Sequence, residues 1–244
     1  MKSKIASNRE VKRGYFSMEF EFSGDAEPGQ FVMLKVAEHN DPLLRRPMSI
    51  AGIENGVMSV IFKVVGRGTA LLAEKRSGDY IDVIGPFGSI FSPPQTGTVL
   101  LVGGGIGVAP LLFWTRRNPS RMAAAFIGGA SENDILCSDG FSEVHIATEN
   151  GSLGRKGLVT APLVDHPAYR DKTGYLLACG PTGMLKAIDQ LAAKDGLRGE
   201  LSLEERMGCG FGVCLGCVCD TTGGRKRMCV EGPVFKTGEV LWRI

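Results

Sequence analysis

The sequence is poor in histidine, in net charge and in long apolar runs. Its 244 residues include three histidines, and the formal net charge is +2. This near balance, with no block of lysine or arginine, argues against a nucleic-acid partner. No apolar stretch approaches the roughly 18 residues of a membrane-spanning helix, and the N-terminal residues lack the apolar core of a secretory signal. We therefore expect neither nucleic acid nor a membrane among the partners.

Side chains arranged for acid–base catalysis are also missing from the sequence pattern. His39, His145 and His166 lie far apart along the chain, and we expect them to be surface or structural residues. No pair of carboxyl groups stands out. Such a pattern is compatible with redox chemistry, because bound cofactors then carry the reaction.

Cysteine is concentrated in one segment. The stretch MGCGFGVCLGCVCDTTGGRKRMCV has the spacing C-x4-C-x2-C, followed by a further Cys after eleven residues, and it supplies Cys209, Cys214, Cys217 and Cys229. Plant-type [2Fe–2S] clusters use this ligand spacing, although with a longer last gap. Interspersed glycines suit a tight loop whose backbone N–H groups approach sulfur. The segment predicts a cluster that moves single electrons.

Two other interpretations of these cysteines are a structural zinc site and a packed group of free thiols. Zinc sites favour paired C-x2-C units or cysteine combined with histidine. Here there is one C-x2-C unit and no histidine nearby. Cys219, a fifth cysteine in the loop, is expected to be a bystander. Seven cysteines, four of them in this motif, fit a reducing compartment better than a disulfide framework, so we expect a cytoplasmic protein.

The hydrophobic pattern divides the chain into three parts. Residues 1–95 are predicted to form an antiparallel β-barrel of short strands at 15–22, 30–36, 48–53, 57–65 and 80–84, with a hairpin at Asn55-Gly56. Residues 96–199 alternate strands (99–102, 123–127, 143–148, 175–178) with helices (108–117, 181–195), which predicts a doubly wound parallel α/β domain. Residues 200–244 hold the cysteine module.

Two motifs in the first part have phosphate-binding character. Arg46 in the run RRPMSI sits beside a proline-stiffened strand start, where a guanidinium can present a fixed fork to a diphosphate. Gly68 and Thr69 are predicted at a helix start, where free N–H groups meet phosphate. The alternatives are a surface arginine pair and an ordinary glycine turn.

Two motifs in the second part lie where a parallel sheet binds ligands. Gly103, Gly104, Gly105 and Gly107 form a glycine turn between a strand and a helix, but without the full G-x-G-x-x-G pattern. Cys179, Gly180 and Pro181 end a later strand, and the small thiol could pack beside a nicotinamide ring without acting as a nucleophile. The alternatives are a ligand-free glycine turn and a buried cysteine.

The order of these motifs resembles the ferredoxin-NADP reductase superfamily: RPMS, GRGT, GPFG, GGGIGVAP and CGP. With the cysteine segment added, the chain from about residue 5 to 240 resembles the electron transfer subunits of NAD-dependent, class 1B dihydroorotate dehydrogenases. The resemblance implies FAD on the barrel, a nicotinamide dinucleotide on the α/β domain and a [2Fe–2S] cluster at the C-terminal module.

The resemblance also implies residue roles and a partner. It carries FAD binding onto Arg46, Pro47, Met48, Ser49, Ile61, Phe62, Lys63, Gly68 and Thr69, and cluster ligation onto Cys209, Cys214, Cys217 and Cys229. The implied partner is an FMN-containing catalytic subunit that oxidises dihydroorotate in pyrimidine biosynthesis, in a heterotetramer of two plus two subunits. Electrons would pass through the cluster and FAD to NAD⁺.

Other hypotheses stay open from sequence alone. The same motif order fits a flavin and iron–sulfur subunit of NADH-dependent ferredoxin:NADP reductases or of sulfite reductases. A zinc-stabilised interaction module on an inactive reductase fold is a third hypothesis, which the intact motifs disfavour. NAD is favoured over NADP because Glu132 and Asp134 follow the second α/β strand and would repel a 2′-phosphate.

Overall fold

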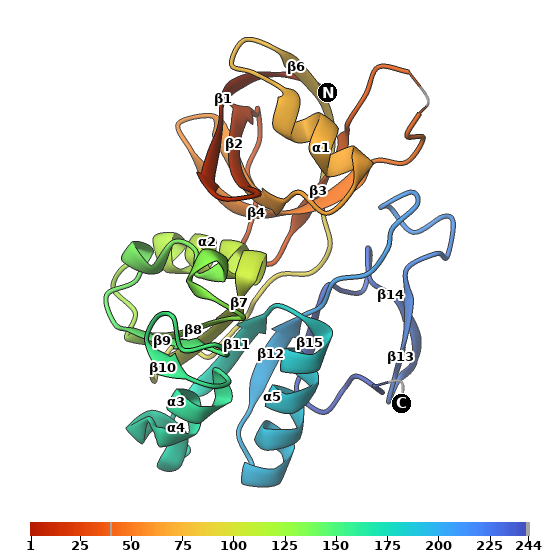
Figure 1. Cartoon of the computed structure of the whole chain (residues 1–244). Coiled ribbons are helices and arrows are strands. Elements are labelled where there is room, and N and C mark those ends of the chain that lie inside the picture. Colours follow the sequence, from red (N-terminus) through yellow and green to blue (C-terminus); the bar gives the residue numbers. More distant parts are fainter. Residues whose placement is uncertain (40, 243–244) are drawn as a thin grey trace.

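The computed structural model describes residues 1–39 and 41–242. Its N-terminal part is a closed antiparallel barrel in the order β1-β2-β5-β4-β3-β6 (Figure 1). The strands are β1 (Lys2–Lys12), β2 (Tyr15–Glu21), β3 (Phe31–Lys35), β4 (Arg46–Glu54), β5 (Val57–Lys63) and β6 (Tyr80–Phe87), and helix α1 (Arg67–Glu74) connects β5 to β6. The predicted antiparallel barrel is therefore confirmed.

Strand β1 was absent from the sequence prediction. In the sequence KSKIASNREVK only Ser3 and Ile5 are buried, so the strand shows almost no apolar alternation. It nevertheless closes the barrel, pairing with β2 along its length and with β6 near its start. Long-range pairing, which local pattern does not reveal, determines this strand.

The second part is a seven-stranded sheet in the order β10-β9-β8-β7-β11-β12-β15. Its central strands β7 (Val99–Gly104), β8 (Ala123–Gly129), β9 (Val144–Thr148) and β11 (Tyr175–Cys179) are parallel, as predicted. The edges are β10 (Arg155–Lys156) on one side, and β12 (Gly199–Ser202) and β15 (Val234–Lys236) on the other. Residues of β7 are all buried, as expected where helices cover both faces of a sheet.

Helices and short 3₁₀ turns connect these strands. The α-helices are α2 (Val108–Arg117), α3 (Thr160–Asp165), α4 (Pro167–Arg170) and α5 (Thr182–Asp195), and the 3₁₀ turns are η1 (Gly105–Gly107), η2 (Glu132–Asp134) and η3 (Ser138–Gly140). The sequence predicts Pro181 as the first residue of this helix, but Pro181 is the N-cap and α5 begins one residue later; Gly196 ends the helix with φ 74°, as expected. No helix within the described ranges is long and apolar enough to cross a membrane.

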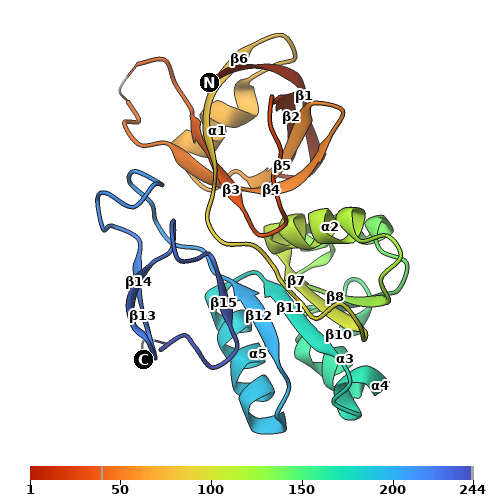
Figure 2. The same cartoon turned by 180° about the vertical axis from the view of Figure 1, so that it is seen from behind.

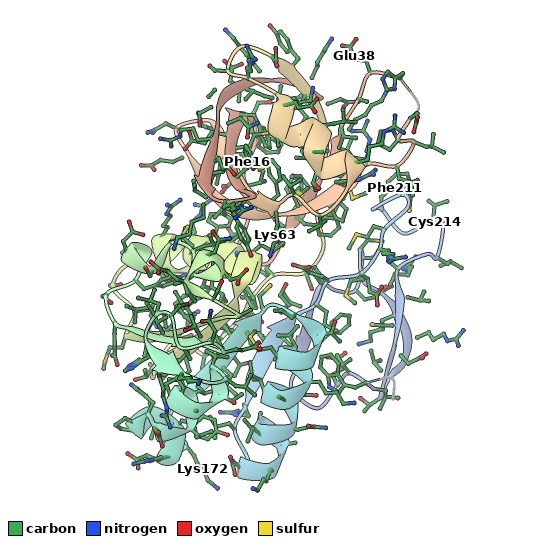
Figure 3. All side chains as sticks on the ribbon, viewed as in Figure 1. Phe16, Glu38, Lys63, Lys172, Phe211 and Cys214 are labelled. Carbon is green, nitrogen blue, oxygen red and sulfur yellow. The ribbon has the colours of Figure 1, made fainter. Side chains whose placement is uncertain are left out.

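The C-terminal cysteine segment is tied into both other parts. Strands β13 (Val218–Thr221) and β14 (Gly224–Arg227) form a hairpin, and β15 then pairs antiparallel with β12 at the sheet edge (Figure 2). The loop before the hairpin reaches the barrel, where the ring centroids of Phe211 and Phe87 lie 6.4 Å apart (Phe211 is labelled in Figure 3). A Cβ on Gly210 would stand 2.5 Å from Met33 Cγ, so only glycine fits this approach.

Barrel and sheet are joined by side chains on their facing surfaces. Phe113 of α2 is buried in the barrel core. Lys12 Nζ donates to the carbonyl of Glu132 at 2.8 Å, and Asn133 Nδ2 donates to the carbonyl of Arg13 at 3.0 Å. These contacts hold the turn after β8 against the end of β1.

Asp189 on α5 anchors the end of the chain. It is 5 % exposed and accepts hydrogen bonds from the Gly238 N–H and from Trp242 Nε1, each at 2.7 Å. Both donors follow β15, so this carboxylate fastens the segment that carries the edge strand onto the helix. A buried acceptor with two donors is costly to remove, because both donors then lose their partner.

We predict that Asp189→Ala lowers the melting temperature of the cofactor-loaded protein by about 5 °C or more, since two hydrogen bonds to a charged group contribute about 3 kcal/mol together. Thermal unfolding followed by circular dichroism measures this. Gln190→Ala, at the neighbouring exposed position of α5, is the control and should shift the midpoint little. Equal midpoints for the two variants would contradict the anchoring role.

Candidate functional site

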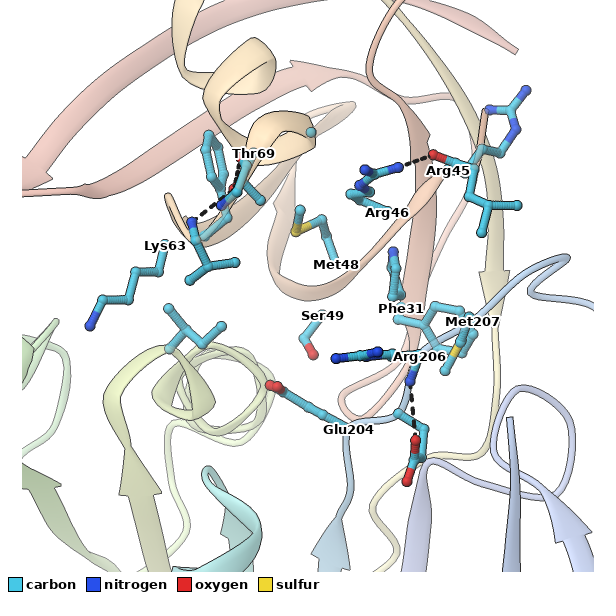
Figure 4. A pocket seen from close by; sticks show the side chains of 18 of the residues that line it. Phe31, Arg45, Arg46, Met48, Ser49, Lys63, Thr69, Glu204, Arg206 and Met207 are labelled. Atoms are coloured by element: carbon cyan, nitrogen blue, oxygen red, sulfur yellow. Dashed lines mark hydrogen bonds between the residues drawn. The ribbon is translucent and has the colours of Figure 1, made fainter. Parts of the chain in front are cut away.

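A cavity of about 910 Å³ lies between the barrel and the segment that follows β12 (Figure 4). Its barrel wall contains all nine residues expected to bind FAD: Arg46, Pro47, Met48, Ser49, Ile61, Phe62, Lys63, Gly68 and Thr69. They come from β4, β5 and α1, which the barrel closure brings side by side. The opposite wall is formed by Ile106 and by residues 203–207.

One end of this cavity has the features of a phosphate site. Thr69 Oγ1 accepts from the Val65 N–H at 2.9 Å and the Gly66 N–H at 3.2 Å, which fixes the turn before α1. The Arg46 guanidinium lies against Gly68 and donates to the Leu44 carbonyl. A Cβ at position 68 would overlap Arg46 Nε, so a side chain there would displace the guanidinium. A helix start beside a guanidinium favours an anion.

Glu204 stands at the other end of the cavity. Its side chain projects into the open cavity, yet surrounding protein atoms desolvate the carboxyl group and raise its pKa. Figure 4 shows the carboxyl group extending toward Ser49. Glu204 was not among the predicted site residues, although its place after the last parallel strand of the sheet was a usable signal, since ligands bind at that edge.

A second cavity of about 710 Å³ opens at the carboxyl ends of the parallel strands. Of the residues expected at the nicotinamide site, Gly104, Gly105, Gly180 and Pro181 line it, together with Gly128, Gly129, Glu149 and Asp134. The two cavities share Lys63, Ile106 and Glu204. A molecule in one cavity can therefore meet a molecule in the other across a common wall.

Three of the expected nicotinamide residues lie behind this wall. Cys179 is completely buried, and burial raises the pKa of its thiol. Gly107 packs against the backbone carbonyl of Cys179, leaving no room for a side chain. Gly103 is buried on β7 beside Val108. In this arrangement the three residues shape the two glycine turns from inside rather than lining the cavity.

Lys63, Asp134 and Tyr15 form a polar cluster where the cavities meet. Lys63 Nζ lies 3.2 Å from Asp134 Oδ1 and 4.6 Å from the centre of the Tyr15 ring. The Tyr15 hydroxyl donates to the same carboxylate oxygen at 2.5 Å. Burial would raise the pKa of Asp134, but the hydrogen bonds from Tyr15 and Lys63 outweigh it and lower that pKa. The carboxylate is therefore anionic and already matched by a cation.

The acidic residues at the second cavity differ partly from the sequence expectation. Asp134 and Glu149 line the cavity, whereas Glu132 does not. Glu149 follows β9, a strand that the argument about NAD preference left out. The acidic character of the cavity still opposes a 2′-phosphate.

The four motif cysteines form two close pairs. The backbone N–H of Cys209 donates to Cys214 Sγ and that of Cys214 donates to Cys209 Sγ, both at 3.5 Å. The Cys217 and Cys229 sulfurs are 3.3 Å apart, and both residues are 2 % exposed. Two pairs of thiols suit a [2Fe–2S] cluster, in which each iron takes two thiolates.

The backbone of the loop favours thiolates. Burial would raise the pKa of Cys209, but N–H groups of Cys214, Phe211 and Val213 outweigh it and lower that pKa to about 6. Burial and the neighbouring Cys217 raise the pKa of Cys229 to about 12. Cys209 is thus prepared to bind a metal as a thiolate, while Cys229 needs the positive charge of iron to lose its proton.

Cys219 differs from these four. It lies on β13 opposite Lys226, and burial and the acidic neighbours Glu205, Asp220 and Glu239 raise the pKa of its thiol. Acidic surroundings disfavour a thiolate. This environment agrees with the expectation of a bystander.

Two of the three histidines meet in space, which their sequence positions did not suggest. His145 Nε2 and His166 Nε2 both contact Glu143 Oε1, at 2.8 Å and 3.2 Å. His166 Nδ1 accepts from the Ala168 N–H at 3.2 Å, so in the neutral ring Nε2 holds the proton and donates to Glu143. This trio is satisfied as a hydrogen-bond network at the start of α4, away from both cavities.

Comparisons with known proteins agree with this geometry. Residues 204–241 match a family model described as the iron-sulfur cluster binding domain of dihydroorotate dehydrogenase B. A structure described as an NADH-dependent reduced ferredoxin-NADP oxidoreductase superposes with a TM-score of 0.88 at 30% identity, covering 98% of this chain and 90% of that chain. A ferredoxin NADP⁺ reductase from Neisseria gonorrhoeae with bound FAD and NADP superposes with a TM-score of 0.68 at 16% identity, covering 80% and 91%, and shows the shared fold.

Curated relatives extend over the whole chain. The electron transfer subunit of dihydroorotate dehydrogenase B (NAD(+)) from Desulforamulus reducens is 40% identical, covering 98% of this chain and 97% of the relative. The corresponding subunit from Geobacillus thermodenitrificans is 44% identical over 88% of this chain and 87% of the relative. At such identity along nearly the full length, this chain belongs to the family of electron transfer subunits of dihydroorotate dehydrogenase B (NAD⁺).

Proposed function

We propose that this chain is the electron transfer subunit of an NAD-dependent dihydroorotate dehydrogenase. It takes electrons from a catalytic subunit that oxidises dihydroorotate and delivers them to NAD⁺. The observation that carries the proposal is that the cysteine loop, the first cavity and the second cavity lie in a row. Phe211 of the loop packs on Phe87, which packs on Phe31 in the wall of the first cavity, and the two cavities share three lining residues. The names of the relatives indicate dihydroorotate as the electron donor and NAD⁺ as the electron acceptor.

The cofactors that the residues fit are a [2Fe–2S] cluster and FAD, with NAD⁺ as the bound acceptor. The cluster exchanges single electrons, whereas a flavin exchanges one or two and can pass a hydride to a nicotinamide. The protein supplies binding, orientation and electrostatics. Each of these contributions can be assigned to residues around the cavities.

In the first cavity, Arg46 and the N–H groups at the start of α1 would hold the diphosphate of FAD. Met48 and Ile61 offer apolar wall, and Ser49 offers a hydroxyl toward Glu204. Lys63 offers a point charge without the fork of an arginine, and this charge is already paired with Asp134. Pro47, Phe62 and Thr69 would support these groups through packing and capping.

In the second cavity, the turns at Gly104–Gly105 and Gly180–Pro181 would bring backbone close to the dinucleotide. Gly103, Gly107 and Cys179 would act from behind by fixing those turns. Glu149 would favour NAD⁺ over NADP⁺, because a 2′-phosphate would face its carboxylate, whereas Asp134 is already paired with Lys63. We keep the division into a barrel (1–95), an α/β part (96–199) and a cluster module (200–244) as part of this proposal.

The catalytic subunit would dock at the cluster loop. Phe211, Val213 and Leu215 are 53%, 74% and 61% exposed, and such a cluster of large apolar side chains is typical of an interaction surface. Leu43 and Leu44 of the barrel are also exposed, and their loop lies on the same side of the molecule in Figures 1 and 2. A partner there would cover an apolar face and approach the exposed Cys214. We also propose an assembly of two plus two subunits in the cytoplasm, where free cysteines stay reduced.

A second candidate function is a related subunit of an NADH-dependent ferredoxin-NADP oxidoreductase. The TM-score of 0.88 to such a protein favours it, at 30% identity. The two candidates share cofactors and differ in the partner. Anaerobic mixing with the dihydroorotate dehydrogenase catalytic subunit of the same organism distinguishes the two candidates. Reduction of NAD⁺ by dihydroorotate that requires both proteins supports the first candidate. Absence of this activity rules the first candidate out.

We predict that Cys217→Ser loses most of the cluster and at least tenfold of the dihydroorotate-driven NAD⁺ reduction, since one iron loses a buried ligand. Reduction of FAD by NADH should survive, because it bypasses the cluster. Iron content and the two activities measure this. Cys219→Ser is the matched control and should keep all three. Full dihydroorotate-linked activity in the Cys217 variant would show that the ligand set is wrong.

We predict that Gly68→Ala weakens FAD binding about tenfold or more, because the new methyl group displaces the Arg46 guanidinium, a charged donor worth about 1.5–3 kcal/mol. Flavin affinity of the reconstituted protein is the measurement. Gly223→Ala lies in a turn where the Cβ meets nothing closer than 3.8 Å, so it serves as the control. Unchanged flavin affinity in the Gly68 variant would show that Arg46 does not contribute to FAD binding.

We predict that Val213→Asp weakens binding to the catalytic subunit roughly tenfold or more, because a charge replaces an apolar side chain at the centre of the docking face. Analytical ultracentrifugation or calorimetry of the mixed subunits reports the affinity. Met122→Asp introduces the same charge at another exposed apolar position, 73% exposed and remote from the loop. If the Val213 and Met122 variants bind the catalytic subunit equally well, the subunit docks at another surface.

A further inference from the structure

Arg227 connects the two arms of the cysteine site. It ends strand β14, two residues before Cys229, and its Nη1 donates to the carbonyl of Gly212 at 3.2 Å. Gly212 lies between Cys209 and Cys214 on the other arm. The side chain therefore spans from the segment of the fourth cysteine to the loop of the first three.

Glu231 fixes the orientation of this guanidinium. Its carboxylate contacts Arg227 Nη2 at 2.5 Å and Nε at 3.1 Å, and it also accepts from the Arg227 N–H at 2.7 Å. The hydrogen bond from Arg227 outweighs burial and lowers the pKa of Glu231 to about 2. Both side chains are about one-third exposed, so solvent screens the attraction. What the pair provides is a fixed fork that points Nη1 at the loop.

The peptide unit that Arg227 contacts also faces a cluster ligand. The Gly212 carbonyl and the Val213 N–H belong to one peptide group, and this N–H is one of the backbone groups that lower the pKa of Cys209. The Gly212 N–H, in the preceding peptide group, acts in the same direction on the pKa of Cys229, which burial and Cys217 raise overall. A donor at one end of a peptide group polarises it and strengthens the bond made by the other end. Arg227 thus acts on Cys209 through one peptide group.

The glycine at position 212 is part of this arrangement. Its φ is +91°, a region that favours glycine. A Cβ there would stand 2.6 Å from Val230 Cγ2 and 3.2 Å from Arg227 Nη1. A side chain would push the guanidinium away from the carbonyl.

We propose that Arg227 is a positioning residue that raises the reduction potential of the cluster, by holding the Gly212–Val213 peptide against Cys209 and by placing a cation near Cys217 and Cys229. The inference rests on the proposed function for the identity of the four ligands. Reduction adds one electron to the cluster, so the reduced state has more negative charge on its sulfurs. A nearby cation and a polarised N–H stabilise that state more than the oxidised one.

The test compares Arg227→Gln with Arg225→Gln in the cluster-loaded, full-length protein. Arg225 is on the same strand and is also paired with a carboxylate, Asp220, at 3.0 Å, but it is 75% exposed and points to solvent. Dithionite titration followed by electron paramagnetic resonance gives the midpoint potential, and iron analysis gives the cluster content. We expect the Gln variant at 227 to have a lower midpoint potential than both the wild type and the control, with a shifted resonance spectrum.

Arg227→Lys keeps the test decisive if the Gln variant does not load its cluster. Lysine retains the charge but loses the fork, so its potential should lie below the wild-type value. Equal potentials for the 227 and 225 Gln variants, or a Lys variant with the wild-type potential, would overturn the role of the Gly212 contact. A wild-type protein with no [2Fe–2S] resonance would instead refute the proposed function itself.

Discussion

The close approach of the cysteine loop to the barrel is the constraint on which the rest of the site depends. Gly210 sits against Met33 and Phe211 against Phe87, so the cluster loop is packed onto β3 and β6 of the barrel, next to Phe31 of the first cavity. Electron transfer falls steeply with distance, and this contact keeps the cluster segment near the flavin site without requiring a mobile domain. The return of β15 to the sheet edge holds the other end of the same segment.

The two cavities meet because of how a parallel sheet is built. All parallel strands end at one edge, and the loops there form the second cavity. The segment after β12 and the turn η1 after β7 both leave that edge and form the far wall of the first cavity, which is why Glu204 and Ile106 belong to both cavities. Lys63 enters from the barrel and is neutralised by Asp134, so the shared wall holds one balanced ion pair and one carboxyl group of raised pKa.

Much of this arrangement could be predicted from sequence. The apolar runs of β7, β8 and β11, the hairpin at Asn55-Gly56 and the glycine after α5 each have a local cause, and all were found. The expected FAD residues share one cavity because their motifs lie on β4, β5 and α1, which the pairing of the barrel strands brings side by side. The cysteine spacing pointed to a loop that does gather four thiols into two pairs.

Other features depend on long-range pairing that local pattern does not encode. Strand β1 is polar on its exposed face, and β15 exists only because β12 offers an edge. Cys179 was expected beside a ligand, but burial behind the Gly107 turn follows from packing of two loops distant in sequence. Glu204, the Arg227–Gly212 contact and the meeting of His145 with His166 likewise arise from tertiary structure.

The most direct test of the account is anaerobic addition of dihydroorotate to the assembled complex in the absence of NAD⁺, with absorption and electron paramagnetic resonance recorded. The account predicts that both the cluster and the FAD of this chain become reduced, and only when the catalytic subunit is present. A cluster and flavin that stay oxidised in the complex, while NADH still reduces the flavin, would contradict the proposed entry of electrons through the cysteine loop.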